Sequence, residues 1–271
     1  MSRAIAWIDG CWGTAETLGM PLNDRGLQLA DGIFETVLLR HGRPLLLEQH
    51  LERWNSAAAM LGMAKPPRKE NLMPLLQESV ARAELGNGEA VLRLNWSRGA
   101  SERGINLPAK GDERFWLTLQ KGAALFSTVT AVISHGEQRN AASLLSRCKT
   151  FAYGQSIQAR REARQRGAEE ALLRNTKGEL CCGTVANLLV KRKGRWLTPP
   201  LSSGCLPGVM RGRCLALKLA TEADVGSDLQ PGDQAVLINS LSCRPIQSLD
   251  GVDQSPISAA SAEKLWALLL D

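Results

Sequence analysis

The strongest constraint on the fold is an abrupt change of hydrophobic period within the first quarter of the chain. Residues 32–39 form a β-rich run in which side chains alternate, with Phe34 and Thr36 on one face and Glu35 on the other. From residue 46 to residue 61 the apolar residues recur every three or four positions, which is the spacing of an amphipathic helix. The pattern predicts a strand followed closely by a helix.

Short strands and helices continue along the rest of the chain. In the first half we expect further strands at residues 4–8, 90–96 and 114–119, and a second helix at 71–84. The second half adds a helix at 152–166, short strands at 170–174, 179–182, 186–190 and 195–198, a helix opened by residues 204–211 that reaches about residue 220, a strand at 235–238 and a C-terminal helix after Ser255-Pro256.

The composition permits a substantial core but does not single out a class of partner. With 271 residues, of which 44% are hydrophobic, the chain is long enough for one large domain or two of ordinary size. The net charge of +6 comes from scattered basic residues without a long basic run, so the sequence gives no support for nucleic acid binding. A small anionic substrate would account for the charge equally well, and so would chance.

The cysteines and the apolar runs favour a protein of the cytoplasm. No pair among the seven cysteines has the spacing of a zinc site, and adjacent Cys181 and Cys182 make a poor disulfide framework. An odd number of thiols suits a reducing compartment. The N-terminal residues turn polar too soon for a signal peptide, and no apolar stretch approaches the length of a membrane span. We therefore expect a cytoplasmic protein without a metal site.

The central candidate for chemistry is Lys149, which lies among small and apolar residues four positions before Tyr153, the only tyrosine of the chain. Such surroundings would desolvate the side chain, which disfavours the ammonium form and makes the free amine available as a nucleophile. A nucleophilic amine is what Schiff-base formation with a carbonyl compound requires. The alternative is an ordinary surface lysine at the start of a helix.

Two other features point to anion recognition, each with an ordinary alternative. Arg98 and Arg103 lie beside glycines in the loop between two predicted strands, where they would either face a carboxylate or be common loop residues. The proline and glycine before Val209 and Met210 leave free amides at a helix start. Such amides suit a phosphate, although many helices begin in this way.

His50 and Arg53 belong to the helix predicted at residues 46–61. His50 lies near the edge of the apolar stripe, where a packed or capping role fits better than a catalytic one. Arg53, taken alone, would be a solvated residue of that helix.

A series of short motifs runs through nearly the whole chain. The motifs, in order, are Asn23-Asp-Arg-Gly26, Asp31-Gly-Ile-Phe-Glu-Thr36, His50-Leu-Glu-Arg53, Lys149 with Tyr153, Glu169-Glu-Ala-Leu-Leu173, Gly183-Thr-Val-Ala-Asn187, Thr198-Pro199 and Leu206-Pro-Gly-Val-Met-Arg211. In this order and spacing the chain resembles the fold-type IV pyridoxal phosphate enzymes. That group includes branched-chain and D-amino-acid aminotransferases and aminodeoxychorismate lyase.

The resemblance implies an α/β (α+β) protein with the two-domain fold-type IV architecture, similar to D-amino-acid aminotransferase. Residues 1–118 would form the smaller domain, 119–124 the crossing, and 125–271 the larger domain, which carries the cofactor lysine. It also implies pyridoxal 5'-phosphate as cofactor and a homodimer as the working form.

The resemblance also assigns roles to individual residues. Lys149 would hold the cofactor covalently and then move a proton, and Tyr153 would bond the phenolic oxygen of the cofactor. Arg53 would pair with its phosphate, together with the helix start and the loop at Asn239-Ser240. The implied cofactor-binding residues are Lys149, Tyr153, Arg53, Cys182, Val209, Met210, Asn239 and Ser240, and the implied substrate-binding residues are Thr36, Arg98 and Arg103.

One position departs from the family pattern. Family members usually have a glutamate five residues before the asparagine of the Gly-Thr-x-x-Asn stretch, where it pairs with the pyridine nitrogen, and this chain has Cys182 there. Glu179 is a poor substitute, because an odd offset in a strand points it to the opposite face. A thiol cannot hold the ring nitrogen protonated as a carboxylate can, so the cofactor would be a weaker electron sink.

Cys182 in place of the usual glutamate favours elimination over transamination, because the elimination of a good leaving group needs no long-lived carbanion. Two stretches, Trp96–Gly104 and Asn239–Ile246, also look like those of aminodeoxychorismate lyases. The resemblance therefore implies a 4-amino-4-deoxychorismate lyase that releases pyruvate and 4-aminobenzoate for folate synthesis. The alternatives are a D-amino-acid or branched-chain aminotransferase and a non-catalytic homologue.

Overall fold

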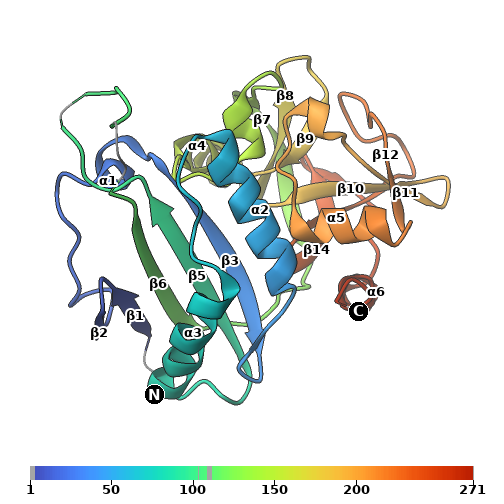
Figure 1. The fold of residues 1–271 in the computed structure, drawn as a ribbon. Helices are drawn as coiled ribbons and strands as arrows, with labels where there is room; N and C mark the ends of the chain where they lie inside the picture. The colour runs from blue at the N-terminus through green and yellow to red at the C-terminus, as the bar shows by residue number, and fades with distance from the viewer. Residues whose placement is uncertain (1–3, 103, 109–111, 271) are drawn as a thin grey trace. The chain divides into compact units, whose positions relative to one another are not determined.

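A computed structural model describes residues 4–102, 104–108 and 112–270 of the chain. The chain divides into two compact units. The first unit consists of Met1–Ala123 and Cys148–Ala152, and the second consists of Ala124–Arg147 and Tyr153–Asp271. Both units mix helices and strands (Figure 1), as the alternation of hydrophobic periods predicts.

The first unit is built on one six-stranded sheet in the order β2-β1-β6-β5-β3-β4, in which every neighbouring pair is antiparallel. Helix α2 packs on β3, and α3 packs on β1 and β6. Apolar residues of both helices and of the sheet form one buried cluster, to which Trp54 contributes the largest side chain. The elements are β1 (Ile5–Ile8), β2 (Cys11–Gly13), α1 (Arg25–Leu29), β3 (Gly32–Arg40), β4 (Arg43–Pro44), α2 (Leu47–Met60), α3 (Lys69–Ala83), β5 (Glu89–Ser97) and β6 (Arg114–Lys121).

The Cys148–Ala152 segment belongs to the first unit although it follows 24 residues of the second. It pairs with the start of β3: the Phe34 amide donates to the Lys149 carbonyl at 2.9 Å, and the Phe151 amide donates to the Gly32 carbonyl at 3.0 Å. A Cβ on Gly32 would lie 2.2 Å from a carbon of the Phe151 ring, so a glycine is needed for this approach. The sequence predicts that Lys149 belongs to the larger domain, residues 125–271. The structure instead groups Lys149 with the first unit.

The second unit contains a nine-stranded sheet in the order β12-β11-β10-β13-β14-β7-β8-β9, with β15 beside β14. An extra pairing of β9 with β10 closes part of it into a ring. Helix α4 packs on β7 and β8, α5 on β13, and α6 on β14. The elements are β7 (Val129–Arg139), α4 (Gly154–Gln165), β8 (Glu170–Asn175), β9 (Leu180–Gly183), β10 (Asn187–Arg192), β11 (Arg195–Thr198), α5 (Val209–Ala216), β12 (Ala220–Glu222), β13 (Gln234–Asn239), β14 (Ser242–Leu249), β15 (Val252–Asp253) and α6 (Ala259–Ala267), with short 3-10 turns at Leu144–Arg147 and Leu201–Ser203.

Two helix boundaries in this unit differ from the predicted ones. Helix α5 ends at Ala216 instead of near residue 220, because Lys218 takes a left-handed φ of 57° and β12 begins at Ala220. The cap of α6 is Ser258, whose side chain accepts from the Ser261 amide, and not the Ser255-Pro256 pair. Within the described residues, no helix has the length and apolar character that crossing a membrane requires.

Candidate active site

Lys149 lies beside the face of the first sheet that is turned away from α2. Its Nζ is 4.4 Å from the centre of the Phe34 ring, and the guanidinium carbon of Arg93 is 3.6 Å from the same centre. Lys149 is half-buried, so the amine is partly shielded from water and still accessible. The two cations share one aromatic ring, which attracts positive charge through its π face.

The register of β3 and β5 explains why these side chains meet. Phe34 lies opposite Asn95 and Thr36 opposite Arg93, and directly opposed residues of antiparallel strands point to the same face. Arg93 is oriented by its Nε, which donates to Asn95 Oδ1 at 2.8 Å. The structure thus brings Thr36, a predicted substrate contact, onto the face that carries Phe34.

The opposite face of β3 carries a buried ionic cluster of Glu35, His50 and Arg53. Arg53 Nε donates to Glu35 Oε1 at 2.8 Å, and His50 Nδ1 is 2.7 Å from Glu35 Oε2. Burial alone would raise the pKa of Glu35, but the charge of Arg53 and the hydrogen bonds from His50 and Arg53 lower it to about 2. Glu35 is therefore an anion at neutral pH, and it fixes the guanidinium of Arg53.

His50 has the packed role that the sequence favours. Burial lowers the pKa of His50, and the positive charges of Arg53 and Lys149 lower it further, which together outweigh the hydrogen bond to Glu35. The imidazole is therefore neutral at pH 7, and Nδ1 carries the proton that Glu35 accepts.

Arg98 is occupied by contacts within the first unit. Its Nε donates to Asp31 Oδ2 at 2.8 Å, Nη1 to the Gly62 carbonyl at 3.0 Å and Nη2 to the Leu61 carbonyl at 2.8 Å. Arg25 donates to the same Asp31 oxygen at 2.8 Å. This geometry favours a structural role for Arg98, joining β5 to the end of α2. Arg103, the other arginine predicted for the substrate, lies outside the described residues.

The start of α5 in the second unit has the features predicted for a phosphate site. Among the described residues, the amides of Val209 and Met210 have no hydrogen-bond partner. A Cβ on Gly208 would lie 1.9 Å from Asn187 Oδ1, so a larger residue here would displace the Asn187 side chain or the start of the helix. Asn187 also donates from Nδ2 to the Leu206 carbonyl at 2.9 Å, which holds the loop before the helix.

The loop at Asn239-Ser240 lies at the end of β13, the strand that pairs with β10. Ile238 is opposite Asn187, so this loop and the loop held by Asn187 flank the same end of the paired strands. Asn239 is tied down: its Oδ1 accepts from the Leu241 amide at 2.8 Å, and its Nδ2 donates to the Val185 carbonyl at 3.2 Å. The predicted phosphate-binding loop is thus a fixed turn.

Cys182 is a buried residue of β9, directly opposite Asn187 of β10 and Leu173 of β8. The two carboxylates nearest to Cys182 in the sequence, Glu179 and Glu170, are hydrogen-bonded to other residues. Glu179 Oε2 accepts from Asn175 Nδ2 at 2.9 Å, within the turn before β9. Glu170 Oε1 accepts from Thr184 Oγ1 at 2.5 Å, and its other oxygen pairs with Arg160.

These donors match the functional groups of pyridoxal phosphate. A half-buried amine and an oriented guanidinium are present in the first unit. The second unit has two amides at a helix start that are unpartnered among the described residues. Tyr153, half-buried at the N-terminus of α4, supplies a phenol. Within the described ranges, no group of His, Cys, Asp and Glu side chains could hold a metal ion. The residues therefore fit the phosphate cofactor that the motifs imply.

Sequence reasoning missed two side chains of this site. The strand predicted at residues 90–96 gives Arg93 no role of its own, although Arg93 alternates with apolar Leu92 and Leu94 and shares a face with Asn95. Glu35 lies between Ile33 and Val37 on a face that must be buried, and a buried charge requires partners such as His50 and Arg53. Polar residues inside an apolar strand were the available signal in both cases.

The chain is similar to class IV aminotransferases and to aminodeoxychorismate lyases. The amino-transferase class IV family matches residues 32–249. The chain is 26% identical over 267 residues to aminodeoxychorismate lyase of Bacillus subtilis, which covers 90% of this chain and 86% of the lyase. It is 25% identical over 264 residues to D-alanine aminotransferase of Listeria monocytogenes, covering 90% and 89%. A hypothetical aminotransferase from Mycobacterium tuberculosis in its PLP-bound form superposes with a TM-score of 0.82 at 20% identity, covering 98% of each chain.

Proposed function

Because this chain belongs to the amino-transferase class IV family, we propose that it is a 4-amino-4-deoxychorismate lyase. The family confirms the predicted fold-type IV architecture and pyridoxal phosphate as the cofactor. The proposal adds the substrate and the reaction: 4-amino-4-deoxychorismate is split into 4-aminobenzoate and pyruvate.

The observation that carries the proposal is the environment of Cys182. A buried thiol occupies the position where the family pattern has a carboxylate, and Glu179 and Glu170 are both held by other partners. No acid of this segment is available to protonate a pyridine nitrogen and strengthen the cofactor as an electron sink. This situation supports a reaction in which electrons leave with a departing group, as they do when enolpyruvate is eliminated.

Pyridoxal phosphate, when bound, supplies a carbonyl carbon that takes up amines and a ring that withdraws electrons. The role of Lys149 is to accept a proton at Nζ. We assign to it the removal of the hydrogen on the ring carbon that bears the substrate's amine, next to the carbon that carries the enolpyruvyl group. The carbon–oxygen bond to the enolpyruvyl group then breaks, the carbocycle becomes aromatic, and the released enolpyruvate gains a proton to become pyruvate.

Other residues of the chain bind and orient. Arg93 would pair with a carboxylate of the substrate next to Lys149, since its guanidinium is already aligned by Asn95 and Phe34. Thr36 would contact the substrate from the same face. Arg53, held by Glu35, would pair with the cofactor phosphate, as would the amides of Val209 and Met210.

A D-amino-acid or branched-chain aminotransferase is the second candidate. It is favoured by the similarity to a D-alanine aminotransferase over nearly the same length as to the lyase. The lyase is preferred because transamination requires a stabilised carbanion, which the thiol at position 182 does not support.

We also propose that the enzyme works as a homodimer in the cytoplasm. The dimer rests on the family resemblance, and the compartment on seven free cysteines, six of which are buried. Light scattering coupled to gel filtration at micromolar concentration tests the dimer, because a single monomeric species would reject it.

The reaction is tested by two assays on the holoenzyme. With 4-amino-4-deoxychorismate we expect 4-aminobenzoate and pyruvate in equal amounts, and with D-alanine and 2-oxoglutarate we expect far slower glutamate formation. Borohydride followed by mass spectrometry should place the cofactor on Lys149. Lys149→Ala should lose the label and at least about a hundredfold in rate, whereas Lys177→Ala, in an exposed turn, should retain both. Rapid glutamate formation without lyase turnover would reject the lyase.

A further inference from the structure

Residues 184–186 connect β9 to β10 and lie between groups that the family pattern assigns to the cofactor. Cys182 precedes the connection on β9, Asn187 follows it on β10, and the two residues are directly opposed. Asn187 holds the loop before α5, and the Val185 carbonyl accepts from Asn239 Nδ2 at 3.2 Å. The connection therefore joins both loops proposed for the phosphate to the strand position proposed for the ring nitrogen.

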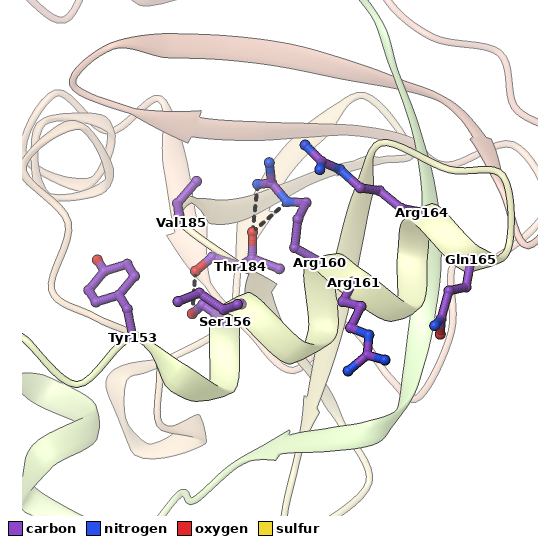
Figure 2. Close-up of a pocket in the computed structure, with 9 residues that line it drawn as sticks. Tyr153, Ser156, Arg160, Arg161, Arg164, Gln165, Thr184 and Val185 are labelled. Atoms are coloured by element: carbon purple, nitrogen blue, oxygen red, sulfur yellow. Dashed lines mark hydrogen bonds between the residues drawn. The ribbon is translucent and has the colours of Figure 1, made fainter.

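Thr184 fixes this connection, because all three of its polar groups are hydrogen-bonded. Its hydroxyl donates to Glu170 Oε1 at 2.5 Å and accepts from Arg160 Nη2 at 2.6 Å, and its amide donates to Glu170 Oε1 at 3.3 Å. Its carbonyl accepts from Ser156 Oγ at 2.7 Å. Figure 2 shows the bonds from Ser156 and Arg160 meeting at Thr184. Thr184 is 6% exposed, so water competes little for these groups.

The Thr184 hydroxyl lies between a buried anion and its counter-charge. Glu170 is a buried carboxylate that pairs with Arg160, and both side chains also bond Thr184 Oγ1. Hydrogen bonds to charged groups are stronger than those between neutral groups. The hydroxyl therefore gives this short connection two charge-assisted bonds, which restrict its motion.

The bond from Ser156 links the connection to α4. Ser156 lies in the first turn of this helix, whose N-terminal cap is Tyr153, the residue proposed to bond the phenolic oxygen of the cofactor. Tyr153 and Thr184 line one hollow between α4 and the connection. Within the second unit, Thr184 thus joins the start of α4 to the strand position and the loops proposed for the cofactor.

We propose that Thr184 is a positioning residue for pyridoxal phosphate, which holds the connection so that Cys182 and Asn187 stay in place relative to α4. Thr184 acts through these residues and needs no contact with the cofactor. The inference rests on the proposed cofactor-binding residues, and not on whether the reaction is elimination or transamination. The alternative is that Thr184 only stabilises the second unit and has no effect on cofactor binding.

Thr184→Val keeps the shape of the side chain and removes the hydroxyl. We expect its affinity for pyridoxal phosphate to fall by about tenfold or more, because two charge-assisted bonds at a buried position are lost. Equilibrium dialysis of the holoenzyme against graded concentrations of pyridoxal phosphate measures this affinity through the absorbance of the bound cofactor. Thr184→Ser keeps the hydroxyl, so its affinity should lie within about twofold of that of the wild type.

Ser134→Ala is the matched control, because Ser134 belongs to a similar network in the last turn of α4. Its hydroxyl donates to Glu162 Oε2 at 2.6 Å, and Glu162 pairs with Arg166. Urea unfolding should show that Ser134→Ala and Thr184→Val both lower the free energy of unfolding, whereas only Thr184→Val weakens cofactor binding. A destabilised variant that is still folded keeps its affinity, because nearly all molecules remain competent to bind.

Ser156→Ala is the second variant, in case Thr184→Val does not fold. It removes only the donor to the Thr184 carbonyl and should weaken cofactor binding by about threefold or more. Wild-type affinity in either of these two variants would overturn the inference. So would a loss of affinity in Ser134→Ala as large as that in Thr184→Val, since lower stability alone would then explain the effect. Because no substrate is present, none of these results depends on the proposed reaction.

Discussion

Arg53 holds the buried carboxylate of Glu35 through two hydrogen bonds, from Nε at 2.8 Å and from Nη2 at 2.5 Å. Glu35→Gln keeps the shape but removes the charge that balances Arg53. We expect the free energy of unfolding to fall by about 3 kcal/mol, because the guanidinium stays buried without its counter-charge. Urea denaturation measures the change.

The matched control is Glu89→Gln, which removes a partly exposed partner of Arg40 in the same sheet. Its effect should stay below about 1 kcal/mol, as for other exposed pairs. If both variants unfold at the same urea concentration, the Glu35–Arg53 pair does not stabilise the fold.

The acid side of the stability profile should depend on Glu35. Its pKa in the folded protein is about 2, below the ordinary value of 4.5, so the native state binds this proton more weakly than the unfolded state does. The resulting stability is fully present above about pH 4.5 and is lost as the pH falls toward 2. Urea unfolding at several pH values should give a steep decline in the wild type and a shallower one in Glu35→Gln. Parallel profiles would contradict this assignment.

Arg93 and Arg98 should respond differently to the same substitution. Arg93→Gln removes a guanidinium beside Lys149, so KM for a substrate carboxylate should rise by about tenfold or more with little loss of stability. Arg98→Gln should instead destabilise the protein, since Asp31 and two carbonyls lose a buried donor. Steady-state kinetics measures KM for both variants, and urea unfolding measures their free energies of unfolding. A KM effect confined to Arg98→Gln would reverse the two roles.

Cys182→Glu should shift the balance between the two candidate reactions. A carboxylate at this position would hold the pyridine nitrogen protonated, so the rate of D-alanine transamination should rise relative to that of the lyase reaction. Cys182→Ser is the control, because it replaces the thiol by a neutral group of similar size and should leave the ratio unchanged. Parallel assays of both activities measure the ratio, and an identical ratio in both variants would refute the role given to the thiol.

Gly208→Ala should weaken retention of the cofactor. The added Cβ would lie 1.9 Å from Asn187 Oδ1, so either the start of α5 moves or Asn187 is displaced and releases the Leu206 carbonyl in the loop before the helix. We expect roughly tenfold weaker binding of pyridoxal phosphate, measured by absorbance after dialysis. Gly212→Ala adds the same methyl group within the same helix, where it would meet no atom within 4 Å beyond the adjoining helix backbone, and should retain the cofactor. Equal retention would remove α5 from the phosphate site.

The sequence predicts the regular elements well where one period dominates. The helix expected at residues 46–61 and the strand expected at 32–39 both occur, at Leu47–Met60 and Gly32–Arg40, because each has an uninterrupted apolar pattern. The strand Val129–Arg139 was not predicted, since its second half is polar and half-exposed. Its pairing with β8 and β14 is a long-range property that local pattern does not encode.

The candidate site is harder to predict from the sequence than the fold is. The Lys149 motif and the loop before Val209 stand out by composition. The structure places the Lys149 amine 4.4 Å from the centre of the Phe34 ring and gives the start of α5 no side-chain cap. Arg93 could not be found in this way, because its role depends on the register that sets it opposite Thr36. Arg98 illustrates the converse: an arginine beside a glycine suggests a ligand contact, but its hydrogen bonds go to Asp31 and to the end of α2.

Because the short segment from Cys148 to Ala152 belongs to the first unit, a single cut of the chain cannot separate the two units. A single cut after Ala123 would leave these residues, Lys149 included, on the fragment that lacks β3. Neither half expressed alone would therefore carry both Lys149 and the strand edge with which its segment pairs. Domain swapping between homologues should exchange residues 148–152 together with the first 123, or the chimaera will pair the lysine with a foreign edge.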